Sequence, residues 1–339
     1  MSLSLIDISS AIRNPDTCLF VNKLKGGHPC MFSPTLPISG SGSFATAYKY
    51  ELADGSLKAI RIWTKEDSSI RPILESSQEV SKELSRIQSH YFVDYEFYND
   101  AILINGKRYP LLIMDWCDGL PLKEYIRHNL DNPRALGKLA DNFLMMFRYM
   151  HKNSISHGDL QHGNIMVDKE GKIRLLDYDS LYFPTSFFAN KSEVVKGYES
   201  YQHPNRKKNH LMGPKVDYFS ELIIYISILA IRESPSLWNE YNVSDNDTRL
   251  LFSEIDFKDL SSSPLFSRLS SFQSPLPQLL NVLKMYLQEN DILRLNPFDS
   301  YIKLKYMESL YPVYCIRCGT KMEYGDNYCW HCGSKLIYN

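Results

Sequence analysis

The sequence lacks any apolar stretch long enough to cross a membrane. Its longest nearly apolar run, LIIYISILAI at residues 222–231, is about half of the ~20 residues that a spanning helix needs, so it predicts a buried core helix. The first residues, MSLSLIDISSAIRNPD, have no basic start followed by an apolar core, and Asp7 comes early. This excludes the pattern of a secretory signal. We therefore expect a cytoplasmic protein with no membrane partner.

Net charge is nearly absent too. The chain has 38 Lys and Arg against 39 Asp and Glu, a formal net charge of −1, and this balance argues against a general attraction to nucleic acid or to anionic lipid. We expect no nucleic-acid partner. Internal repeats and low-complexity tracts are missing, so the 339 residues, 44% of them hydrophobic, are expected to form one large or two modest globular cores.

Cysteine is scarce until the chain nears its C-terminus. There, YCIRCGTKMEYGDNYCWHCGSKL holds two C-x-x-C-G knuckles, formed by Cys315, Cys318, Cys329 and Cys332. Two such turns bring four thiolates to one point, which suits a tetrahedral Zn²⁺ site, and a reducing compartment favours this interpretation over disulfides. His331, inside the second knuckle, is an alternative ligand, but four cysteines are the simpler solution. We predict a zinc ribbon at residues 311–339 that the metal folds.

The predicted ribbon carries aromatic side chains at Tyr324, Tyr328 and Trp330 and few basic ones. Aromatic side chains are enriched in protein interfaces. Ribbons of this size also bind nucleic acid or merely cap a neighbouring domain. We expect a protein partner that binds through the ribbon.

The remainder of the chain divides into two parts of different pattern. Between residues 36 and 109, the short β-like runs TAYKYEL, LKAIRIW and AILING alternate with the turn signals ADG and NG. One amphipathic helical segment, at residues 72–88, interrupts them. After YPLLIMDWCDG, helical patterns dominate. We predict an α+β protein with a mostly β lobe at residues 1–115 and a mostly helical lobe at residues 116–310.

The first of three motifs that suit phosphate chemistry is SGSGSFATAYKY. It places Gly40, Ser41 and Gly42 in a hairpin between two predicted strands. Glycines there let backbone N–H groups approach a triphosphate, and Phe44 at the tip can cover it. By itself, the pattern fits a plain glycine- and serine-rich β-turn equally well.

The second motif is KAIRIW, in which Arg61 lies on the strand that follows this hairpin. Its cation can neutralise phosphates when a carboxylate on the neighbouring helix steers it. Glu79 is the best placed candidate, and Glu75 and Glu83 are alternatives at helical spacing. An ordinary strand arginine on a solvated face is the competing interpretation.

The third motif is ISHGDLQHGNIMVD, which places Asp159 and Asn164 in a tight turn after a long helix. A carboxylate there can accept a proton from an attacking hydroxyl, and an amide carbonyl can bind Mg²⁺. Asp177, at the end of the apolar strand IRLLDYD, is the natural second ligand. A polar turn can contain the same letters, but the ordered succession of all the parts argues for a site.

Taken in order, these motifs resemble the protein-kinase-like fold. The glycine loop GSGSFATAY, the strand KAIR, the hinge LLIMDWCDG, the catalytic loop HGDLQHGN and the metal-binding LLDYD agree in order and spacing across about 270 residues. The resemblance implies a two-lobed α+β kinase-like fold, here with a small four-cysteine zinc ribbon appended. The chain is also similar to a bacterial group of such kinases with HGDLQHGN and YQHP signatures, which often carry a C-terminal zinc ribbon.

The same resemblance implies the roles of individual residues. Asp159 is expected as the catalytic base, with Asn164 and Asp177 as ligands of Mg²⁺ or Mn²⁺ and ATP as the nucleotide. Met114 is expected as the gatekeeper. The backbone of Asp115 to Cys117 is expected to bind adenine.

A downstream segment, GYESYQHPN, resembles the substrate-docking end of a protein-kinase activation segment, with Gly197, Tyr201 and Pro204 in register. KVDYFSELIIYI supplies Asp217, where protein kinases anchor the catalytic-loop backbone. Aminoglycoside and choline kinases share the HGD form of the loop but generally lack the docking run. The resemblance thus implies a kinase that phosphorylates Ser or Thr of a protein substrate. The alternatives are a pseudokinase scaffold that acts by protein binding and a small-molecule phosphotransferase of the aminoglycoside or choline type.

The main exposed basic run is expected in NRKKNH, residues 205–210. A loop of this composition is either simply solvated or recruits an acidic substrate peptide. The sequence leaves both interpretations open.

Two departures from the family pattern bear on activity and regulation. Arg61 replaces the usual strand lysine, and a planar, bidentate cation changes a site shaped for a point charge. ATP binding is expected to survive this better than turnover. Gly158 replaces the arginine that typically receives a phosphate on the activation segment, so phosphorylation of Thr185, Ser186 or Ser192 lacks its usual receiver. We expect constitutive activity or regulation by a partner.

Two further departures lie in the catalytic and metal-binding loops. Gln161 stands where protein kinases usually have a lysine, which leaves the γ-phosphate to the metals, to Gln161 itself or to His162, although a histidine in such a loop is more often structural. DYD replaces DFG. Tyr178 can pack where the phenylalanine packs, and Asp179 suits a turn because Asp tolerates unusual backbone angles, with metal binding as the alternative.

Overall fold

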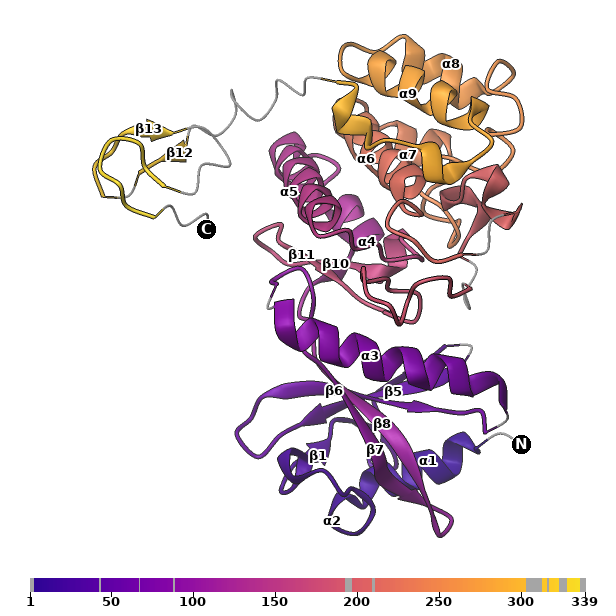
Figure 1. Ribbon diagram of the computed structural model, residues 1–339, viewed down its shortest axis with the longest axis vertical. Coiled ribbons are helices and arrows are strands. Elements are labelled where there is room, and N and C mark those ends of the chain that lie inside the picture. Colours follow the sequence, from indigo (N-terminus) through magenta and orange to yellow (C-terminus); the bar gives the residue numbers. More distant parts are fainter. Residues whose placement is uncertain are drawn as a thin grey trace.

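The computed structural model describes residues 3–42, 44–66, 68–87, 89–192, 197–208, 211–302, 313–315, 317–322 and 328–335. Two lobes are stacked along the long axis of the molecule, the first rich in strands and the second in helices (Figure 1). The mostly β and mostly helical parts that the sequence predicts are therefore both present. The predicted boundary between residues 310 and 311 lies outside the described residues.

An antiparallel sheet forms the centre of the first lobe, with the strand order β1-β5-β6-β8-β7 and with β4 paired to β5. A separate short hairpin joins β2 to β3. The strands are β1 (His28–Pro29), β2 (Met31–Ser33), β3 (Leu36–Pro37), β4 (Ser39–Ser41), β5 (Ala45–Glu51), β6 (Leu57–Trp63), β7 (Tyr95–Ile104) and β8 (Lys107–Asp115).

Two tight turns of the sheet follow from their sequences. Gly55, in the turn between β5 and β6, has φ +84°. Asn105 and Gly106, between β7 and β8, have φ 48° and 79°, as a type I′ hairpin turn requires at both central positions. The ADG and NG signals thus predicted both hairpins.

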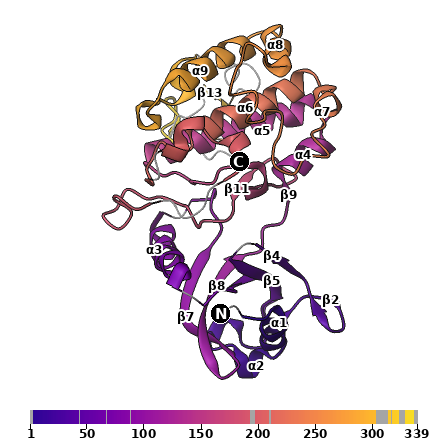
Figure 2. The same ribbon diagram turned by 90° about the vertical axis from the view of Figure 1, so that its right-hand side faces the viewer.

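Helices cover both faces of this sheet, with α3 on one side and α1 and α2 on the other (Figure 2). The helix α3 (Arg71–Ile87) buries Ile73, Val80 and Leu84, which confirms the predicted amphipathic helix. The N-terminal helices α1 (Leu5–Arg13) and α2 (Pro15–Cys18) were not predicted.

The N-terminal helices complete a core of their own. Ile8 and Ile12 of α1 are buried in one apolar cluster with Tyr50, Ile60 and further side chains of β5 to β8. The Oγ of Ser4 accepts the Ile6 N–H at 3.2 Å and so caps the helix. The outer face of the sheet is therefore closed by the first part of the chain.

The second lobe is built around two long helices, α5 and α6. The run LIIYISILAI lies in α6, where every residue from Tyr218 to Ile231 is buried, which confirms the predicted core helix. A small sheet of order β11-β10-β9 faces the first lobe. The elements of this lobe are β9 (Leu120–Pro121), α4 (Leu122–His128), α5 (Pro133–Lys152), β10 (Ile165–Val167), β11 (Ile173–Leu175), α6 (Tyr218–Glu233), α7 (Leu237–Glu240), α8 (Pro264–Ser270) and α9 (Leu276–Gln288).

The cysteine-rich tail contains one short antiparallel pair, β12 (Val313–Tyr314) with β13 (Lys321–Met322). Short 3₁₀ turns complete the secondary structure, among them residues 162–164 in the loop that precedes β10. Within the described part of the chain, no helix is both long and apolar enough to cross a membrane.

Candidate active site

The loop between α5 and β10 is held in place by Asp217 at the start of α6. The Asp217 carboxylate accepts the backbone N–H groups of His157 and Gly158, the latter at 3.0 Å. Gly158 has φ +81°, and a Cβ on it would lie 2.3 Å from the Ser180 carbonyl oxygen, so this position requires glycine. The predicted anchoring role of Asp217 is confirmed.

A buried arginine holds Gly158 through its carbonyl, in the next peptide of the loop. Arg206 is only 6% exposed, and its guanidinium donates to the carbonyl oxygens of Gly158 and Val216. The next residue, Lys207, pairs with Glu199. The prediction of an exposed basic run at residues 205–210 is therefore wrong for Arg206, which ties the docking segment to the loop, while Asn209 and His210 lie outside the described residues.

Asp159 and Asn164 face each other across this loop. The Asn164 amide nitrogen donates to the Asp159 backbone carbonyl at 2.8 Å and to its Oδ2 at 3.1 Å. The other carboxylate oxygen, Oδ1, is buried and has no hydrogen-bond partner among the described residues. Burial raises the pKa of Asp159, opposed by His157 and by the hydrogen bond from Asn164.

Gly197 brings the docking segment directly onto this carboxylate. A Cβ on Gly197 would lie 2.2 Å from Asp159 Oδ1 and 2.8 Å from the Gln202 side-chain nitrogen. Only glycine allows the backbone to come this close. Farther along the segment, Ser220 Oγ donates to the Tyr201 carbonyl at 2.7 Å, which fixes the segment on α6.

Asp177 begins the DYD segment after β11, with φ +60° and a side chain 46% exposed. Tyr178 is fully buried. Its hydroxyl accepts the Val93 N–H at 2.9 Å and donates to the Leu175 carbonyl at 2.6 Å. The tyrosine thus packs in the core as predicted and also ties β11 to the segment that leads into β7.

Arg61, on β6, reaches both aspartates of the DYD segment. Its two terminal nitrogens contact the Asp179 carboxylate at 2.9 and 2.5 Å, and Nη1 contacts Asp177 Oδ1 at 3.2 Å. Burial alone lowers the pKa of Arg61, but the carboxylates of Asp179 and Asp177 more than offset this and raise it. Burial raises the pKa of Asp179, and the Arg61 guanidinium opposes that shift.

The expected contact between Arg61 and Glu79 is not made in the described structure. The Glu79 carboxylate contacts Lys82 at 3.2 Å, on its own helix. The two alternatives are also paired within α3, Glu75 with Arg71 and Glu83 with Arg86. The sequence assigned Asp179 a turn role, because nothing local indicates a partner in β6.

The glycine hairpin is formed by β4 and the start of β5. Gly40 pairs with Ala47 and Ser41 with Thr46. A Cβ on Gly40 would meet nothing within 4 Å, and the Gly42 N–H donates to the Ala45 carbonyl at 2.9 Å. The Phe44 ring is half-buried, with the Lys65 ammonium 4.4 Å from its centroid.

Comparison with known proteins identifies the family. Residues 35–306 match the family model of the protein kinase domain. The chain belongs to the protein kinase domain family. A segment of 188 residues is 28% identical to the serine/threonine-protein kinase Nek3 of Oryza sativa subsp. japonica, and it covers 53% of this chain and 30% of that protein.

Two further kinases match shorter segments. The chain is 25% identical over 122 residues to the serine/threonine-protein kinase PrkC of Bacillus subtilis (strain 168), which is 36% of this chain and 19% of the relative. It is 38% identical over 80 residues to sperm motility kinase 2B of Mus musculus, which is 22% of this chain and 16% of the relative. The matched segments thus span less than a third of the length of each of these relatives.

The segment that is expected to bind adenine begins at the end of β8. In the sheet register, Met114 lies opposite Ala59 of β6 and Tyr95 of β7. The Asp115 carboxylate contacts Lys58 and accepts the Asp94 N–H at 3.4 Å.

The next residue of this segment is still joined to the sheet. The Trp116 N–H donates to the Leu57 carbonyl at 3.2 Å. Cys117 is half-buried, and burial raises the pKa of its thiol. The residues predicted to contact adenine therefore form a continuous segment between the two lobes.

His162 and Gln161, the side chains suggested in place of the usual catalytic-loop lysine, are both uncharged near pH 7. His162 Nδ1 lies 2.7 Å from the Tyr201 hydroxyl, and burial, followed by the nearby Lys123, lowers the pKa of His162 to about 4. Gln161 Oε1 accepts the Gly163 N–H at 2.7 Å. His162 is thus neutral near pH 7, in agreement with a structural role, and Gln161 braces the loop.

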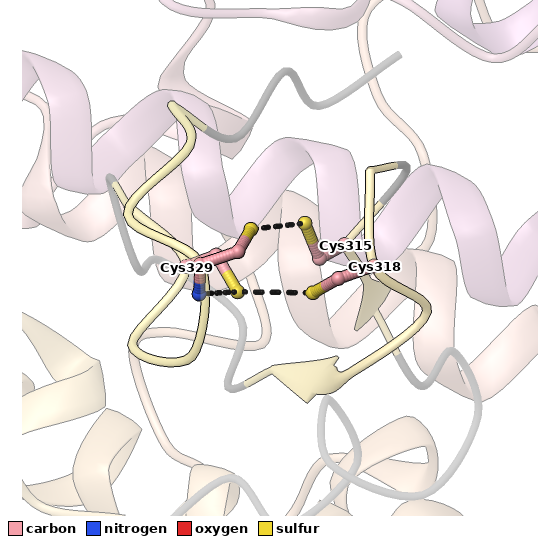
Figure 3. A group of neighbouring side chains, drawn as sticks. Cys315, Cys318 and Cys329 are labelled. Atoms are coloured by element: carbon pink, nitrogen blue, oxygen red, sulfur yellow. Dashed lines mark hydrogen bonds between the residues drawn. The ribbon is translucent and has the colours of Figure 1, made fainter.

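The four tail cysteines form one cluster, in which all the sulfur atoms lie within 4.8 Å of one another (Figure 3). Cys315 Sγ is 3.5 Å from Cys332 Sγ, and Cys318 Sγ is 3.6 Å from Cys329 Sγ. With Zn–S bonds of ~2.3 Å, the edges of a tetrahedral site of four sulfur atoms measure about 3.8 Å. The cluster could therefore hold a metal ion of this kind.

The two knuckles repeat the same backbone geometry. The N–H groups of Gly319 and Gly333 donate to the carbonyls of Cys315 and Cys329, both at 2.8 Å, and both glycines have positive φ. His331, the alternative ligand, is exposed and lies edge-on to the Trp330 ring at 5.8 Å. The donor set of this cluster consists of sulfur.

Proposed function

We propose that this protein is an ATP- and Mg²⁺- or Mn²⁺-dependent kinase that phosphorylates serine or threonine residues of a protein substrate. The observation that carries the proposal is the arrangement of Asp159, whose buried Oδ1 lacks a partner among the described residues, beside Asn164 and the docking segment. The serine/threonine kinases to which the chain is similar support the same reaction class.

The proton-accepting group in this proposal is the Asp159 carboxylate. Asn164 and the loop backbone hold the carboxylate, and its raised pKa makes it a better base than an ordinary aspartate. Oδ1 accepts no hydrogen bond from the described residues and Oδ2 accepts only the one from Asn164, so the carboxylate keeps the capacity to accept the proton of a Ser or Thr hydroxyl. Asp159 thus orients the hydroxyl and takes its proton.

Asn164 and Asp177 are the proposed metal ligands. Asn164 uses its side-chain N–H groups on Asp159, which leaves its carbonyl oxygen as the ligand atom. The Asp177 side chain is half-exposed, which leaves its carboxylate accessible to a metal ion. Oxygen donors of this kind fit Mg²⁺, which when bound neutralises charge on the transferring phosphoryl group.

We place the nucleotide between the glycine hairpin and the hinge. The backbone of Gly40, Ser41 and Gly42 and the ring of Phe44 would face the phosphates, and Arg61 would supply the cation. Met114, Asp115 and Cys117 would line the adenine end. No atom of the described residues lies within 4 Å of the position that a Cβ on Gly40 would occupy, so a ligand has room to approach the backbone there.

A protein acceptor is favoured by the docking segment at residues 197–204. It is anchored to α6 through Tyr201 and to the Thr248 carbonyl through Ser200, and Arg206, just after the segment, contacts the catalytic loop. A small-molecule phosphotransferase has no use for such a platform. We therefore rank that alternative below a protein kinase.

The competing function is a pseudokinase scaffold. One observation favours it, because Arg61 and Asp177 contact each other in a pair that a bound nucleotide and metal would have to share. Labelled ATP with Mg²⁺ and general protein acceptors separates the two functions. Phosphoryl transfer that is lost in Asp159→Ala and Asp177→Ala supports the kinase, and ATP binding without aspartate-dependent transfer supports the scaffold.

We further propose that the tail is a zinc ribbon that binds a protein partner. The sulfur geometry fits Zn²⁺, and Tyr328 and Trp330 are 61% and 72% exposed. A cytoplasmic location suits thiolate ligands, because that compartment keeps thiols reduced. Native mass spectrometry should find one Zn²⁺ per chain that is lost when the cysteines are alkylated, and its absence from protein purified without chelator would contradict the proposal.

A further inference from the structure

Arg61 and Asp179 form a bidentate ion pair between two largely buried side chains. The guanidinium makes a two-pronged contact with the carboxylate at 2.9 and 2.5 Å, and the two side chains are 13% and 6% exposed. Bidentate pairs of this kind fix the orientation of both partners, and a buried setting strengthens them. The pair joins β6 of the first lobe to the DYD segment of the second.

The carboxylates of α3 are not available for this task in the described structure. Glu75, Glu79 and Glu83 each contact a basic residue of their own helix. Asp179 is therefore the buried carboxylate that aligns the Arg61 side chain.

The chemistry of arginine explains why the two departures, Arg61 and Asp179, occur together. Guanidinium has five N–H groups in a rigid fork. Three of the contacts described for Arg61 go to the two aspartates, which leaves N–H groups for phosphate oxygens. A lysine has a single nitrogen and no fixed fork, so it gains much less from a carboxylate at this position.

The surroundings hold the pair in one place. Tyr95 is buried beside it, where burial and then Asp179 raise the pKa of the Tyr95 hydroxyl. The Tyr95 ring lies 5.1 Å from that of Tyr178, whose hydroxyl is itself hydrogen-bonded to the backbone of Val93 and of Leu175. The Arg61–Asp179 pair thus lies among buried aromatic side chains that are themselves held in place.

We propose that Asp179 is the positioning residue for Arg61 in nucleotide binding, in the place that the sequence pattern assigns to Glu79. The inference rests on the proposed function, because it needs a cleft that binds ATP. Asp179 does not touch the reacting atoms. It holds the guanidinium so that its remaining N–H groups meet the phosphates.

Isothermal titration of ATP, without and with Mg²⁺, tests this on the full chain. We expect Asp179→Asn to weaken ATP binding about tenfold, since hydrogen bonds to charged groups are worth at least that factor. Arg61→Met should weaken binding similarly, and the double variant no further, because Asp179 acts through Arg61. Glu79→Gln should stay within about twofold of the wild type.

Steady-state kinetics adds a readout that a merely structural role would not move. A residue that aligns the phosphate-binding cation should raise the KM for ATP in Asp179→Asn by more than it lowers kcat. Asp299→Asn, which removes the negative charge from a contact of 2.8 Å with Arg148 in the second lobe, is the matched control. It should lower the thermal midpoint and leave ATP affinity unchanged.

The outcomes separate the inference from the proposed function. A wild-type protein that binds no ATP overturns the proposed function and the inference with it. If the wild type binds ATP and Asp179→Asn binds it equally well or more tightly, the inference is wrong but the proposed function stands. The ion pair would then compete with the nucleotide for Arg61. A loss in Glu79→Gln as large as in Asp179→Asn also overturns it. If Asp179→Asn does not fold, the double variant with Arg61→Met decides, because it has no unpaired guanidinium. A loss of ATP affinity larger than that of Arg61→Met by itself would contradict the idea that Asp179 acts through Arg61.

Discussion

Replacement of Arg206 by methionine is expected to destabilise the protein and to disturb the catalytic loop. Methionine keeps most of the side-chain volume but donates no hydrogen bond, so the buried carbonyls of Gly158 and Val216 lose their donor. An orphaned buried acceptor costs about 1–3 kcal/mol, which gives about 2–6 kcal/mol for the two. For a domain of this size the thermal midpoint should fall by roughly 5–20 °C.

Calorimetry and phosphoryl-transfer assays check this together. The Gly158 carbonyl belongs to the peptide that precedes Asp159, so kcat should fall by about 10- to 100-fold, as small misplacements of reacting groups do. Arg206→Lys, which can still donate to one of the two carbonyls, should have a thermal midpoint and a kcat between those of the wild type and of Arg206→Met. Lys207→Met is the matched control, because Lys207 is exposed and pairs with the exposed Glu199. Equal midpoints for Arg206→Met and Lys207→Met would refute the reasoning.

Three further changes test the site. Gly197→Ala should reduce kcat by at least about 100-fold, because its Cβ would lie 2.2 Å from Asp159 Oδ1; a variant that turns over normally would contradict the close approach. Asp159→Asn should be inactive yet as stable as the wild type or more stable at pH 8. Burial raises the folded-state pKa of Asp159, so its charged form opposes folding, and the advantage of the amide should shrink as the pH falls through that pKa in thermal scans; an advantage that grows in acid would contradict this sign. Tyr178→Phe restores the family's usual residue but removes the partner of the Val93 N–H and of the Leu175 carbonyl, so denaturant titration should show a loss of about 1–3 kcal/mol, and equal stability would argue against these bonds.

Local patterns were sufficient wherever the deciding interactions are close in sequence. The hairpin between β7 and β8 follows from Asn105 and Gly106, and α3 from its apolar spacing. Asp217 was found because the order of motifs placed it, although its partners His157 and Gly158 lie far along the chain. The order of the motifs along the chain thus predicted one contact between residues that are far apart in the sequence.

The missed features depend on contacts that no local pattern encodes. Asp179 looks like a turn residue until β6 brings Arg61 against it. Arg206 lies in a basic run, which is ordinarily solvated, and its burial follows from the Gly158 carbonyl that the folded loop presents. The helix α1 does carry Ile8 and Ile12 at helical spacing behind the capping Ser4, but a segment this short becomes stable only against the sheet that it covers.

The closure of the sheet by α1 and α2 sets a practical limit on how far this chain can be shortened from its N-terminus. The family match begins at residue 35, after both helices and after Leu24, whose carbonyl accepts the Tyr50 hydroxyl at 2.9 Å. A fragment that starts there would expose Tyr50, Ile60 and the apolar residues around them to water. We expect such a fragment to aggregate, and we therefore expect the smallest unit that folds to be longer than the recognisable family region.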